Sequence, residues 1–502
     1  LQDRTTGNPP IVTTMRPWRW NAHHALGVTG NRLGRVSGTA TLATLVAVVA
    51  LATSGTSAAQ PAGRPATGSP VVGDPVLCGP EVSELTGVTT GWAEGEYLLL
   101  PFEVPTGTAR VEVGYYAPTA AEQDQSLRPG SRRGSGVLDL GLWDASGTSG
   151  PEAFRFWSGN RQGRLDRGMD PIVVSADTDS RTVVAGEVEP GIWHVELGVA
   201  WLAGPSVWRV EVRCPLGDQP EPLEPDRADA SLVADPEPGW YAADFHLHGY
   251  HSSPDGPDPE EMVELARSAG LDIVPVTEYV TPAHWERLGR AQRDNPDLLL
   301  WPGREVITYQ GHLVVLGETP ESVEYRLGHE GTTLGDIQRA AADAGALVSL
   351  AHPTLFPPDV FGNTCRGCFL EAIGEVDWES TELIEVVTEG AVAEFDGQMV
   401  PNPFVDTAVE LWEEQLSLGN RLTAVSGSDE KSGDNYGSTL TMVWAPELSR
   451  TAVDAALRSG HAYVRALGAD SPTIDIVASA PGPDGGRARM GDTLVADTAE
   501  MT

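Results

Sequence analysis

A change in hydrophobic periodicity near residue 240 constrains the fold of this chain more than any other feature. From about 75 to 215, short alternating runs recur at roughly 8–12-residue spacing with turn residues between them, a pattern typical of an all-β sandwich or jelly roll. Beyond 240, apolar runs such as LDIVPVT and LLLWPG alternate with helical stretches such as DPEEMVELARSAG. Strand–helix alternation predicts a parallel sheet, open or closed into a barrel.

Composition marks the boundaries of these regions. Residues 216–239 are acidic and rich in proline, which favours a linker between a β-sandwich domain at 75–215 and an α/β domain at 240–470. From 471 to 502 the pattern becomes strand-like again and stops within a run, so we expect the start of a truncated β-domain.

Residues 1–59 have the pattern of upstream residues followed by a signal peptide. Arginines precede an apolar run at 39–52, and the small residues Ser57 and Ala59 fit a signal-peptidase site. The apolar run is short for a membrane span. We therefore expect cleavage after Ala59, a secreted product and no stable membrane anchor; an uncleaved anchor is the alternative.

Export would permit disulfide bonds between the four cysteines. Cys78 and Cys214 bracket the β-rich region, so a bond between them would join its first and last strands. Cys365 and Cys368 form a C-x-x-C motif in a glycine-containing loop. The sequence there has neither the strand–helix context of a redox motif nor the second pair of a zinc knuckle, so we favour a short structural disulfide.

The charge of the chain restricts its partners. With 71 acidic and 33 basic residues, the formal net charge is -38, which argues against binding to duplex nucleic acid or to an anionic membrane. Aromatic residues of the β-rich region offer a possible glycan contact, although such residues more commonly belong to a core. They are Trp143, Trp157, Trp193, Trp201 and Trp208.

Histidines concentrate in the second half of the chain. The densest group is the D-x-H-x-H motif of Asp244, His246 and His248, which follows a short strand, with His251 close by. Alternation along an extended chain points His246 and His248 to the same side, as two ligands of one metal require. Asp244 shares that parity and could orient a ligand ring or bind a metal directly.

Further candidate residues fall at or near the ends of successive strands: Glu305, His312, His352, Glu385 and Asp429. Each alone could be a capped turn, a satisfied core histidine or a solvated acid, and for Glu385 this structural interpretation is the stronger one. The motifs D-x-H-x-H, G-x-E-V, A-H-P and G-S-D nevertheless converge on the positions where barrel enzymes place their chemistry. Together they predict a metal site.

This ordered set resembles the PHP (polymerase and histidinol phosphatase) superfamily and, within it, the carbaryl-hydrolase-like CehA/McbA metallohydrolases. The resemblance covers about 240–470 and rests on DFHLHGYHSSPDG, WPGREVITYQGHLVVLG, VSLAHP and AVSGSDEK. The β-rich region also looks like the N-terminal domain that often accompanies this subgroup. The resemblance implies a distorted (β/α)7 barrel with two or three metals that hydrolyses phosphoesters or, in some members, carboxyl esters and carbamates.

The resemblance also implies roles for individual residues. It assigns the first metal to His246, His248, Glu305 and Asp429. Glu305 would bridge to a second metal held by His352, with His312 as an additional ligand.

Two departures from the family pattern concern a third metal. The family's T-D-H is Thr277-Glu278-Tyr279 here, and its S-D-x-H is Ser428-Asp429-Glu430-Lys431. Both missing histidines hold the third metal in trinuclear members, so we expect that site to be lost. His251 is either a remnant ligand or a solvent-facing side chain.

Lys431, the only lysine of the chain, stands at one of the altered positions. Because an ammonium group supplies part of the charge of a lost cation, we hypothesise that Lys431 and Tyr279 occupy the third site and polarise a substrate oxygen. A surface lysine without a role is the alternative.

The sequence therefore predicts a secreted hydrolase with two divalent ions, Zn, Mn or Fe, acting through a metal-activated water on a small phosphoester. Asp429 would hold the nucleophile, and Tyr279, Lys431 or His284 would protonate the leaving group. An ester or carbamate hydrolase and a non-catalytic metal- or ligand-binding module are the alternatives. A serine hydrolase is disfavoured because no G-x-S-x-G elbow precedes a helix.

Overall fold

The computed structural model describes residues 71–116, 136–159, 171–178, 180–202, 204–317, 324–362, 365–395, 398–481 and 486–502. The predicted signal peptide lies outside these residues. Among the described residues, Val392–Pro401 belong to one compact unit and the others to a second. The first contributes an antiparallel hairpin, β17 (Val392–Phe395) and β18 (Gln398–Pro401).

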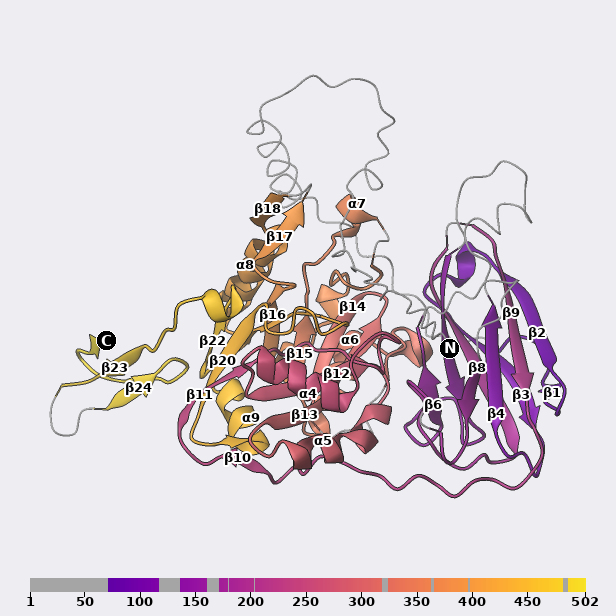
Figure 1. The fold of residues 1–502 in the computed structure, drawn as a ribbon. Coiled ribbons are helices and arrows are strands. Elements are labelled where there is room, and N and C mark those ends of the chain that lie inside the picture. Colours follow the sequence, from indigo (N-terminus) through magenta and orange to yellow (C-terminus); the bar gives the residue numbers. More distant parts are fainter. Residues whose placement is uncertain are drawn as a thin grey trace, which may run out of the picture. The chain divides into compact units, whose positions relative to one another are not determined.

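The N-terminal β-rich region forms a five-stranded sheet, ordered β1-β3-β8-β5-β6, and a four-stranded sheet, ordered β2-β9-β4-β7 (Figure 1). The strands are β1 (Val76–Leu77), β2 (Ser83–Thr89), β3 (Tyr97–Val104), β4 (Val111–Tyr116), β5 (Gly136–Trp143), β6 (Phe154–Trp157), β7 (Ile172–Val174), β8 (Gly191–Leu202) and β9 (Ser206–Arg213). All pairs are antiparallel except β1 with β3.

One hydrophobic core is shared by the two sheets. In β9, every second residue from Ser206 is buried, which is the pattern expected of a strand with one face on a core. Its Val210 and Val212 pack in the same cluster as Phe102 and Trp193 of the other sheet. Four of the five singled-out tryptophans are buried, which favours the core interpretation: Trp143, Trp157, Trp193 and Trp208.

Both expected disulfides are present. Cys78, directly after β1, bonds to Cys214, directly after β9. This bond joins the first and last strands of the β-rich region, as the sequence predicted. Cys365 bonds to Cys368 within a single loop of the second half of the chain.

The second half of the chain is organised by a nine-stranded sheet, ordered β19-β16-β15-β14-β13-β12-β11-β20-β22 (Figure 1). Its strands are β11 (Gly239–Ala243), β12 (Ile273–Tyr279), β13 (Leu299–Thr308), β14 (Gly311–Leu316), β15 (Leu347–Ala351), β16 (Leu383–Thr388), β19 (Thr423–Gly427), β20 (Leu440–Ala445) and β22 (Ala462–Arg465). The end strands β19 and β22 contact each other, so the sheet is nearly closed and barrel-like.

The sheet is mixed, which corrects the expectation of purely parallel strands. β14 runs antiparallel to both neighbours, and β20 runs antiparallel to β11 and β22. Only two residues, Tyr309 and Gln310, separate β13 from β14, and a connection that short can make only a hairpin. The other seven strands share one direction.

Helices pack against this sheet, with α6, α8 and α9 against β15, β16 and β20. The α-helices are α4 (Pro259–Ser268), α5 (Leu288–Asp294), α6 (Leu334–Asp343), α7 (Pro358–Phe361), α8 (Pro403–Ser417) and α9 (Arg450–Arg458). Asp258 caps α4 by accepting a hydrogen bond from the Glu261 amide at 2.9 Å, with Pro259 in the first turn, as the sequence predicted.

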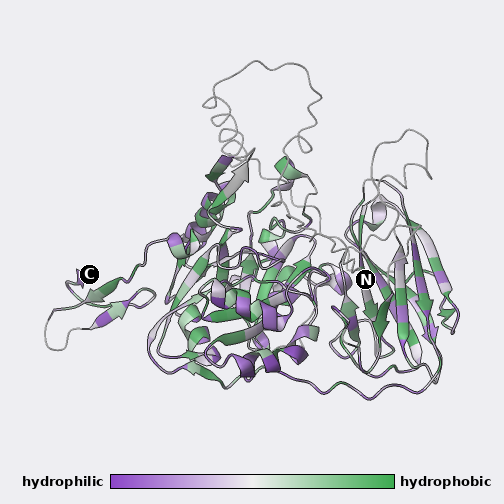
Figure 2. Ribbon diagram, in the orientation of Figure 1, coloured by the Kyte–Doolittle hydropathy of each residue, from purple (hydrophilic) through white to green (hydrophobic). Residues whose placement is uncertain are grey.

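Hydrophobic residues concentrate in the strands, whereas the helices also carry hydrophilic ones (Figure 2). Within the described residues, no helix combines the length and hydropathy of a membrane span.

The short elements complete the fold. The 3₁₀ helices are η1 (Gly91–Ala93), η2 (Ala283–Arg287), η4 (His329–Gly331), η5 (Ile373–Glu375), η6 (Trp378–Ser380) and η7 (Gly468–Asp470). The segment predicted as a linker contains β10 (Val233–Asp235), which pairs with β21 (Leu448–Ser449). Residues 471–502 contain a small antiparallel sheet of β23 (Val477–Ser479), β24 (Arg487–Arg489) and β25 (Glu500–Met501).

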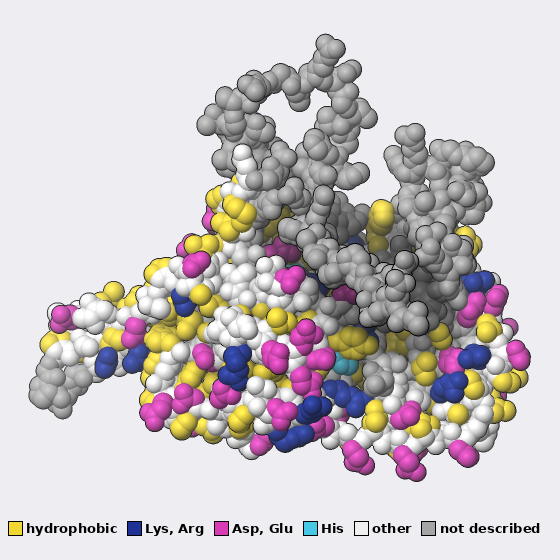
Figure 3. All heavy atoms as spheres, in the orientation of Figure 1, with side chains coloured by type: hydrophobic (Ala, Val, Ile, Leu, Met, Phe, Trp, Pro, Cys, Tyr) yellow, Lys and Arg dark blue, Asp and Glu magenta, His cyan; other side chains and the backbone are white. Residues whose placement is uncertain are grey.

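Acidic and basic side chains are interspersed over the described part of the face drawn in Figure 3. That face shows no continuous basic area of the kind that attracts a phosphate backbone.

Asp139 of β5 is a buried carboxyl group whose Oδ2 accepts a hydrogen bond from the Tyr309 hydroxyl at 2.9 Å. Burial raises the pKa of Asp139 to about 7, although the hydrogen bond from Tyr309 opposes the shift. An aspartate in an unfolded chain has a pKa of about 3.9. Between these two values the folded protein holds a proton that the unfolded chain releases, so this contribution to stability is complete at acid pH and lost as the pH rises.

Asp139→Asn preserves the oxygen acceptor but cannot ionise. As the pH rises from about 4 to about 7, we expect the wild type to lose up to about 4 kcal/mol of stability relative to this variant. Thermal melting of both proteins at about pH 4.5 and about pH 7.5 measures this change. A difference in melting temperature that is the same at both pH values would contradict the raised pKa.

Candidate metal centre

The predicted metal ligands meet at one edge of the nine-stranded sheet, where strands of common direction end. They come from the loop after β11, from β13 and β14, and from the residues that follow β15 and β19: His246, His248, Glu305, His312, His352 and Asp429. Backbone hydrogen bonds from Asp429 N to His246 O (2.9 Å) and from His248 N to Glu430 O (3.1 Å) hold the β11 and β19 loops side by side.

Local backbone strain concentrates at this edge. β12, β15, β16 and β19 are each followed, within two residues, by a non-glycine residue with positive φ: Val280 (52°), His352 (30°), Glu389 (58°) and Asp429 (51°). Such conformations cost on the order of 1–3 kcal/mol each, and β-branched valine adopts them rarely. The surrounding contacts therefore impose this geometry against local preference.

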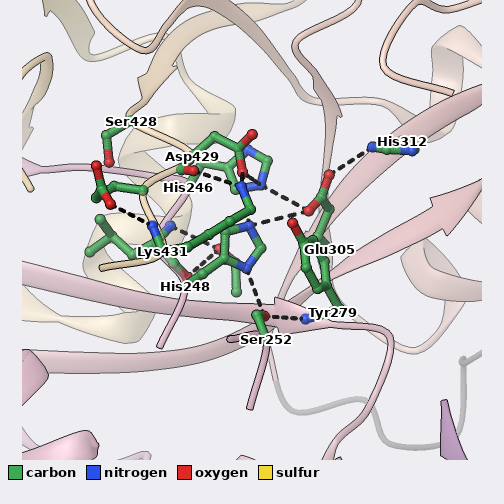
Figure 4. A network of polar contacts seen from close by, with 12 residues as sticks. His246, His248, Ser252, Tyr279, Glu305, His312, Ser428, Asp429 and Lys431 are labelled. Carbon is green, nitrogen blue, oxygen red and sulfur yellow. Dashed lines mark hydrogen bonds and ion pairs between the residues drawn. The ribbon is translucent and has the colours of Figure 1, made fainter. Parts of the chain in front are cut away.

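Glu305 lies at the centre of the cluster (Figure 4). Its Oε2 is 3.3 Å from His246 Nε2 and 3.2 Å from His248 Nε2. Its Oε1 is 2.9 Å from His312 Nδ1 and 3.1 Å from His352 Nε2. A single carboxylate thus faces two separate pairs of imidazoles.

Asp429 completes the first group. Its Oδ1 is 3.0 Å from His248 Nε2 and 3.5 Å from His246 Nε2. Ligand atoms of these residues and Glu305 all lie within 4.8 Å of one another. In the second group, the Cys368 sulfur lies within the same distance of ring nitrogens of His312 and His352. That sulfur is in a disulfide, so it supplies no thiolate to a metal.

In the first group, the outer ring nitrogen of each histidine is held by an acceptor. His246 Nδ1 donates to Glu385 Oε2 at 3.0 Å, and His248 Nδ1 donates to Ser252 Oγ at 2.9 Å. Ser252 is an acceptor here because its own hydroxyl donates to Glu278 Oε2. A neutral imidazole carries one proton, so the inner nitrogens of His246 and His248 present lone pairs to Glu305.

The second group repeats the arrangement with backbone carbonyls. His352 Nδ1 donates to Cys368 O at 3.1 Å, and His312 Nε2 donates to Arg366 O at 3.2 Å. A carbonyl oxygen can only accept, so the inner nitrogens of His312 and His352 also present lone pairs to Glu305.

In this buried centre, imidazole lone pairs therefore face carboxylate oxygens. A bound cation between them would replace this repulsion by attraction. His246 Nε2 and Glu305 Oε2 are buried without a hydrogen-bond partner. Mixed imidazole and carboxylate donors are those that divalent transition metals bind, and a ligating histidine normally donates its other nitrogen to an acceptor. The residues therefore fit a divalent metal ion.

The electrostatics of the centre favour positive charge at the same point. Although burial alone would lower it, the Glu305 and Glu385 carboxylates raise the pKa of His246 above its usual value. Burial likewise opposes ionisation of Glu305, but His246 holds the pKa of Glu305 well below its usual range.

Glu385, for which the sequence favoured a structural role, belongs to the centre. It is buried, and its Oε2 also accepts a hydrogen bond from the His352 amide at 3.1 Å. Sequence reasoning missed Ser252 and Glu278 as supports of His248, and the carbonyls of Arg366 and Cys368. Serine and backbone carbonyl groups are too common for any sequence signal to mark these roles.

Lys431 and Tyr279 lie against the first group (Figure 4). Lys431 Nζ is 2.6 Å from Asp429 Oδ1 and 5.7 Å from the centroid of the Tyr279 ring. That ring is 4.4 Å from the His248 ring, centroid to centroid. The only lysine of the chain thus contacts the candidate ligands.

Two other residues singled out from the sequence, His284 and His251, lie outside both candidate groups of metal ligands. Burial lowers the pKa of His284, with further contributions from His251, whose ring is 5.9 Å away, and from Arg304. Consecutive strand residues point to opposite faces, so Arg304 and Glu305 face opposite ways. The role of His284 in protonating a leaving group stays a prediction. His251 does not face solvent, because it is buried and its Nδ1 accepts from the Thr182 amide at 3.4 Å. Neither candidate group of metal ligands includes it.

Asp244 is bonded to backbone amides. Its Oδ1 accepts from the Ser428 amide at 2.8 Å and its Oδ2 from the Gly437 amide at 3.0 Å. Both oxygens are thus engaged by backbone donors, so the carboxylate fixes the loop that carries Asp429. Neither candidate group of metal ligands includes Asp244.

Comparisons with known proteins give structural neighbours only. No family model and no curated protein matches the chain. A two-domain protein from Bacteroides vulgatus, described as containing a predicted PHP-like metal-dependent phosphoesterase, is 20% identical, with 48% of this chain and 68% of that one covered and a TM-score of 0.33. The lesion-specific endonuclease PfuEndoQ from Pyrococcus furiosus is 15% identical, with 45% of this chain and 58% of that one covered and a TM-score of 0.31. PsfC from Pseudomonas syringae is 18% identical, with 47% of this chain and 94% of that one covered and a TM-score of 0.30.

The placement of Asp244 predicts the behaviour of Asp244→Asn. An amide offers one acceptor oxygen and turns an NH2 group toward a backbone donor, so we expect a loss of about 1–3 kcal/mol in stability. The content of bound divalent metal should not change, because no ligand is removed. Metal analysis and thermal melting measure the two effects. Loss of metal without loss of stability would make Asp244 a ligand after all.

Proposed function

We propose that this chain is a metal-dependent hydrolase of the PHP superfamily that cleaves phosphoesters with two divalent ions. The observation that carries the proposal is the convergence of four imidazole lone pairs on Glu305, each fixed by a hydrogen bond at the outer ring nitrogen. The seven strands of common direction in a nearly closed sheet support a distorted (β/α)7 barrel of that superfamily.

Each ion has an identifiable set of ligands. The first set is His246, His248, Glu305 and Asp429, and the second is Glu305, His312 and His352. These donors suit Zn, Mn or Fe. Ions held there would supply Lewis-acid activation of a water molecule and of the substrate oxygen under attack.

The side chains in and beside the first set of ligands have protonation states suited to hydrolysis. Although burial disfavours the charge, Asp429 raises the pKa of Lys431 above its usual value, so the ammonium group can bind an anionic oxygen. Burial raises the pKa of Tyr279, which keeps its hydroxyl protonated and able to donate a hydrogen bond to a leaving group. Although burial opposes this shift, Lys431 holds the pKa of Asp429 below its usual range, so Asp429 can accept a hydrogen bond from the attacking water.

Two ions are proposed instead of three because the residues of the third site are otherwise engaged. The Glu278 carboxylate accepts from the amides of Gly249 (3.1 Å) and Ser252 (2.8 Å) and from the Ser252 hydroxyl. The Lys431 ammonium stands beside Asp429, where it would supply a positive charge without a metal.

Hydrolysis of a carboxyl ester or carbamate is the second candidate. It is favoured by the pairing of Lys431 with Asp429, because an ammonium already neutralised by a carboxylate attracts a phosphate dianion less strongly.

We also propose that the protein is secreted. The two disulfides support this proposal, because such bonds persist mainly in oxidising compartments.

The reaction is tested by assaying bis-p-nitrophenyl phosphate and 1-naphthyl N-methylcarbamate alongside metal analysis. We expect about two ions per chain, turnover that chelation abolishes, and faster cleavage of the phosphodiester. Glu305→Gln should lose both ions and turnover, whereas Glu286→Gln, the same change in an exposed ion pair with Arg227, should lose neither. Faster cleavage of the carbamate would favour the second candidate, and protein that metal cannot activate would indicate a non-catalytic binding module.

Lys431→Met tests the proposed role of the ammonium group. Turnover should fall by about 100-fold while the metal content stays the same, because a charge that stabilises the transition state is removed without loss of a ligand. Lys431→Arg should recover part of the activity. Unchanged turnover in the methionine variant would leave Lys431 without a catalytic role.

A further inference from the structure

We infer that the loop closed by the Cys365–Cys368 disulfide is a redox-sensitive positioning element of the second metal pocket. In the disulfide form, its carbonyls fix His312 and His352 toward Glu305, and reduction weakens binding of the second ion. The inference rests on the proposed function only in requiring that this pocket binds a metal.

A single loop contacts both histidines of the pocket. The Arg366 carbonyl accepts from His312 Nε2 at 3.2 Å, and the Cys368 carbonyl accepts from His352 Nδ1 at 3.1 Å. The Arg366 carbonyl lies within the ring that the disulfide closes, and the Cys368 carbonyl is attached to the last Cα of that ring. The Cα atoms of the two cysteines are 5.6 Å apart. By accepting from the outer nitrogens, these carbonyls fix which nitrogen of each ring carries the proton. They therefore fix the direction in which the lone pair of the inner nitrogen points.

Gly367 lets the loop approach His312 this closely. It is buried, with φ of 86°. A Cβ added to it would lie 2.8 Å from His312 Nε2 and would also collide with the Thr308 carbonyl oxygen. The close approach of loop backbone to imidazole therefore requires glycine at this position.

The two ends of the loop are held differently. On the C-terminal side, Leu370 N donates to Pro353 O at 3.0 Å and Ala372 N donates to Gln310 O at 2.9 Å, which ties this side to the histidine-bearing segments. The disulfide restrains Arg366 and Gly367 from the other side. Loss of the disulfide should therefore disturb the orientation of His312 more than that of His352.

The chemical step is thiol–disulfide exchange with a dithiol reductant. A thiolate of the reductant attacks the sulfur of Cys365, because Cys365 is the more exposed of the two residues. Both protein cysteines become thiols and the reductant becomes a disulfide. Electrons pass from the dithiol to the Cys365–Cys368 bond, and the two thiol protons of the reductant pass to the two cysteines.

The test is a titration of the full chain with Zn²⁺ by calorimetry, with metal analysis after dialysis. The disulfide form should bind two ions. After reduction by an immobilised dithiol, and equally in the Cys365→Ser/Cys368→Ser variant, the first affinity should stay the same and the second should fall about 10- to 100-fold. Thermal melting verifies that the variant is folded.

Two glycine-to-alanine variants separate the effect of the loop's position from the effect of reducing the disulfide. Gly367→Ala should lose the second ion with the disulfide intact. Gly345→Ala introduces the same backbone strain, at φ of 87°, but its added Cβ meets no atom within 4 Å, so its two affinities should match the wild type.

Three results would overturn the inference. Two ions bound with equal second affinity in the disulfide, reduced and serine forms would leave the loop without a positioning role, while the proposed function would stand. Tighter second binding in the reduced wild type alone would make Cys368 a thiolate ligand and not a positioning residue. A disulfide form that binds no metal would overturn both the inference and the proposed function.

Discussion

The arrangement of the centre depends on one electrostatic constraint, the contact between the Glu305 carboxylate and the inner nitrogens of four imidazoles. Acceptors buried against acceptors are unfavourable unless a cation or protons lie between them. Much of the surrounding structure serves to maintain this contact. The strained residues that follow β12, β15, β16 and β19 lie around it, and the loops after β11 and β19 are bonded to each other beside it.

The groups that orient the imidazoles come from distant parts of the chain. Glu385 on β16 holds His246, the Ser252–Glu278 pair holds His248, and backbone carbonyls of a disulfide loop hold the other two. Each outer contact fixes which nitrogen carries the proton, and so determines where the lone pair points. The second pocket differs from the first because its supports are backbone atoms, which depend on the conformation of one loop and not on side-chain identity.

Sequence patterns predicted the structure correctly where the spacing of neighbouring residues alone decides the conformation. The cap of α4, the alternating burial of β9 and the grouping of His246 with His248 follow from spacing alone. Sequence patterns left the role of a residue open where more than one partner was available to it. Asp244 has the parity of a ligand, yet backbone amides of the loop after β19 occupy its carboxylate. His284 lies outside both candidate groups of metal ligands, and burial lowers its pKa.

The sequence by itself indicated the types of element and the favoured cysteine pairings, and it supplied the set of donors from which a metal centre could be built. Periodicity, caps and ligand chemistry are properties of neighbouring residues, so a single chain reveals them. Only the tertiary structure decided the reversed direction of β14 within the sheet, the face on which each acid lies and the acceptor at each outer nitrogen. Those outcomes depend on which distant backbone groups need partners once they are buried, and no local pattern encodes that requirement.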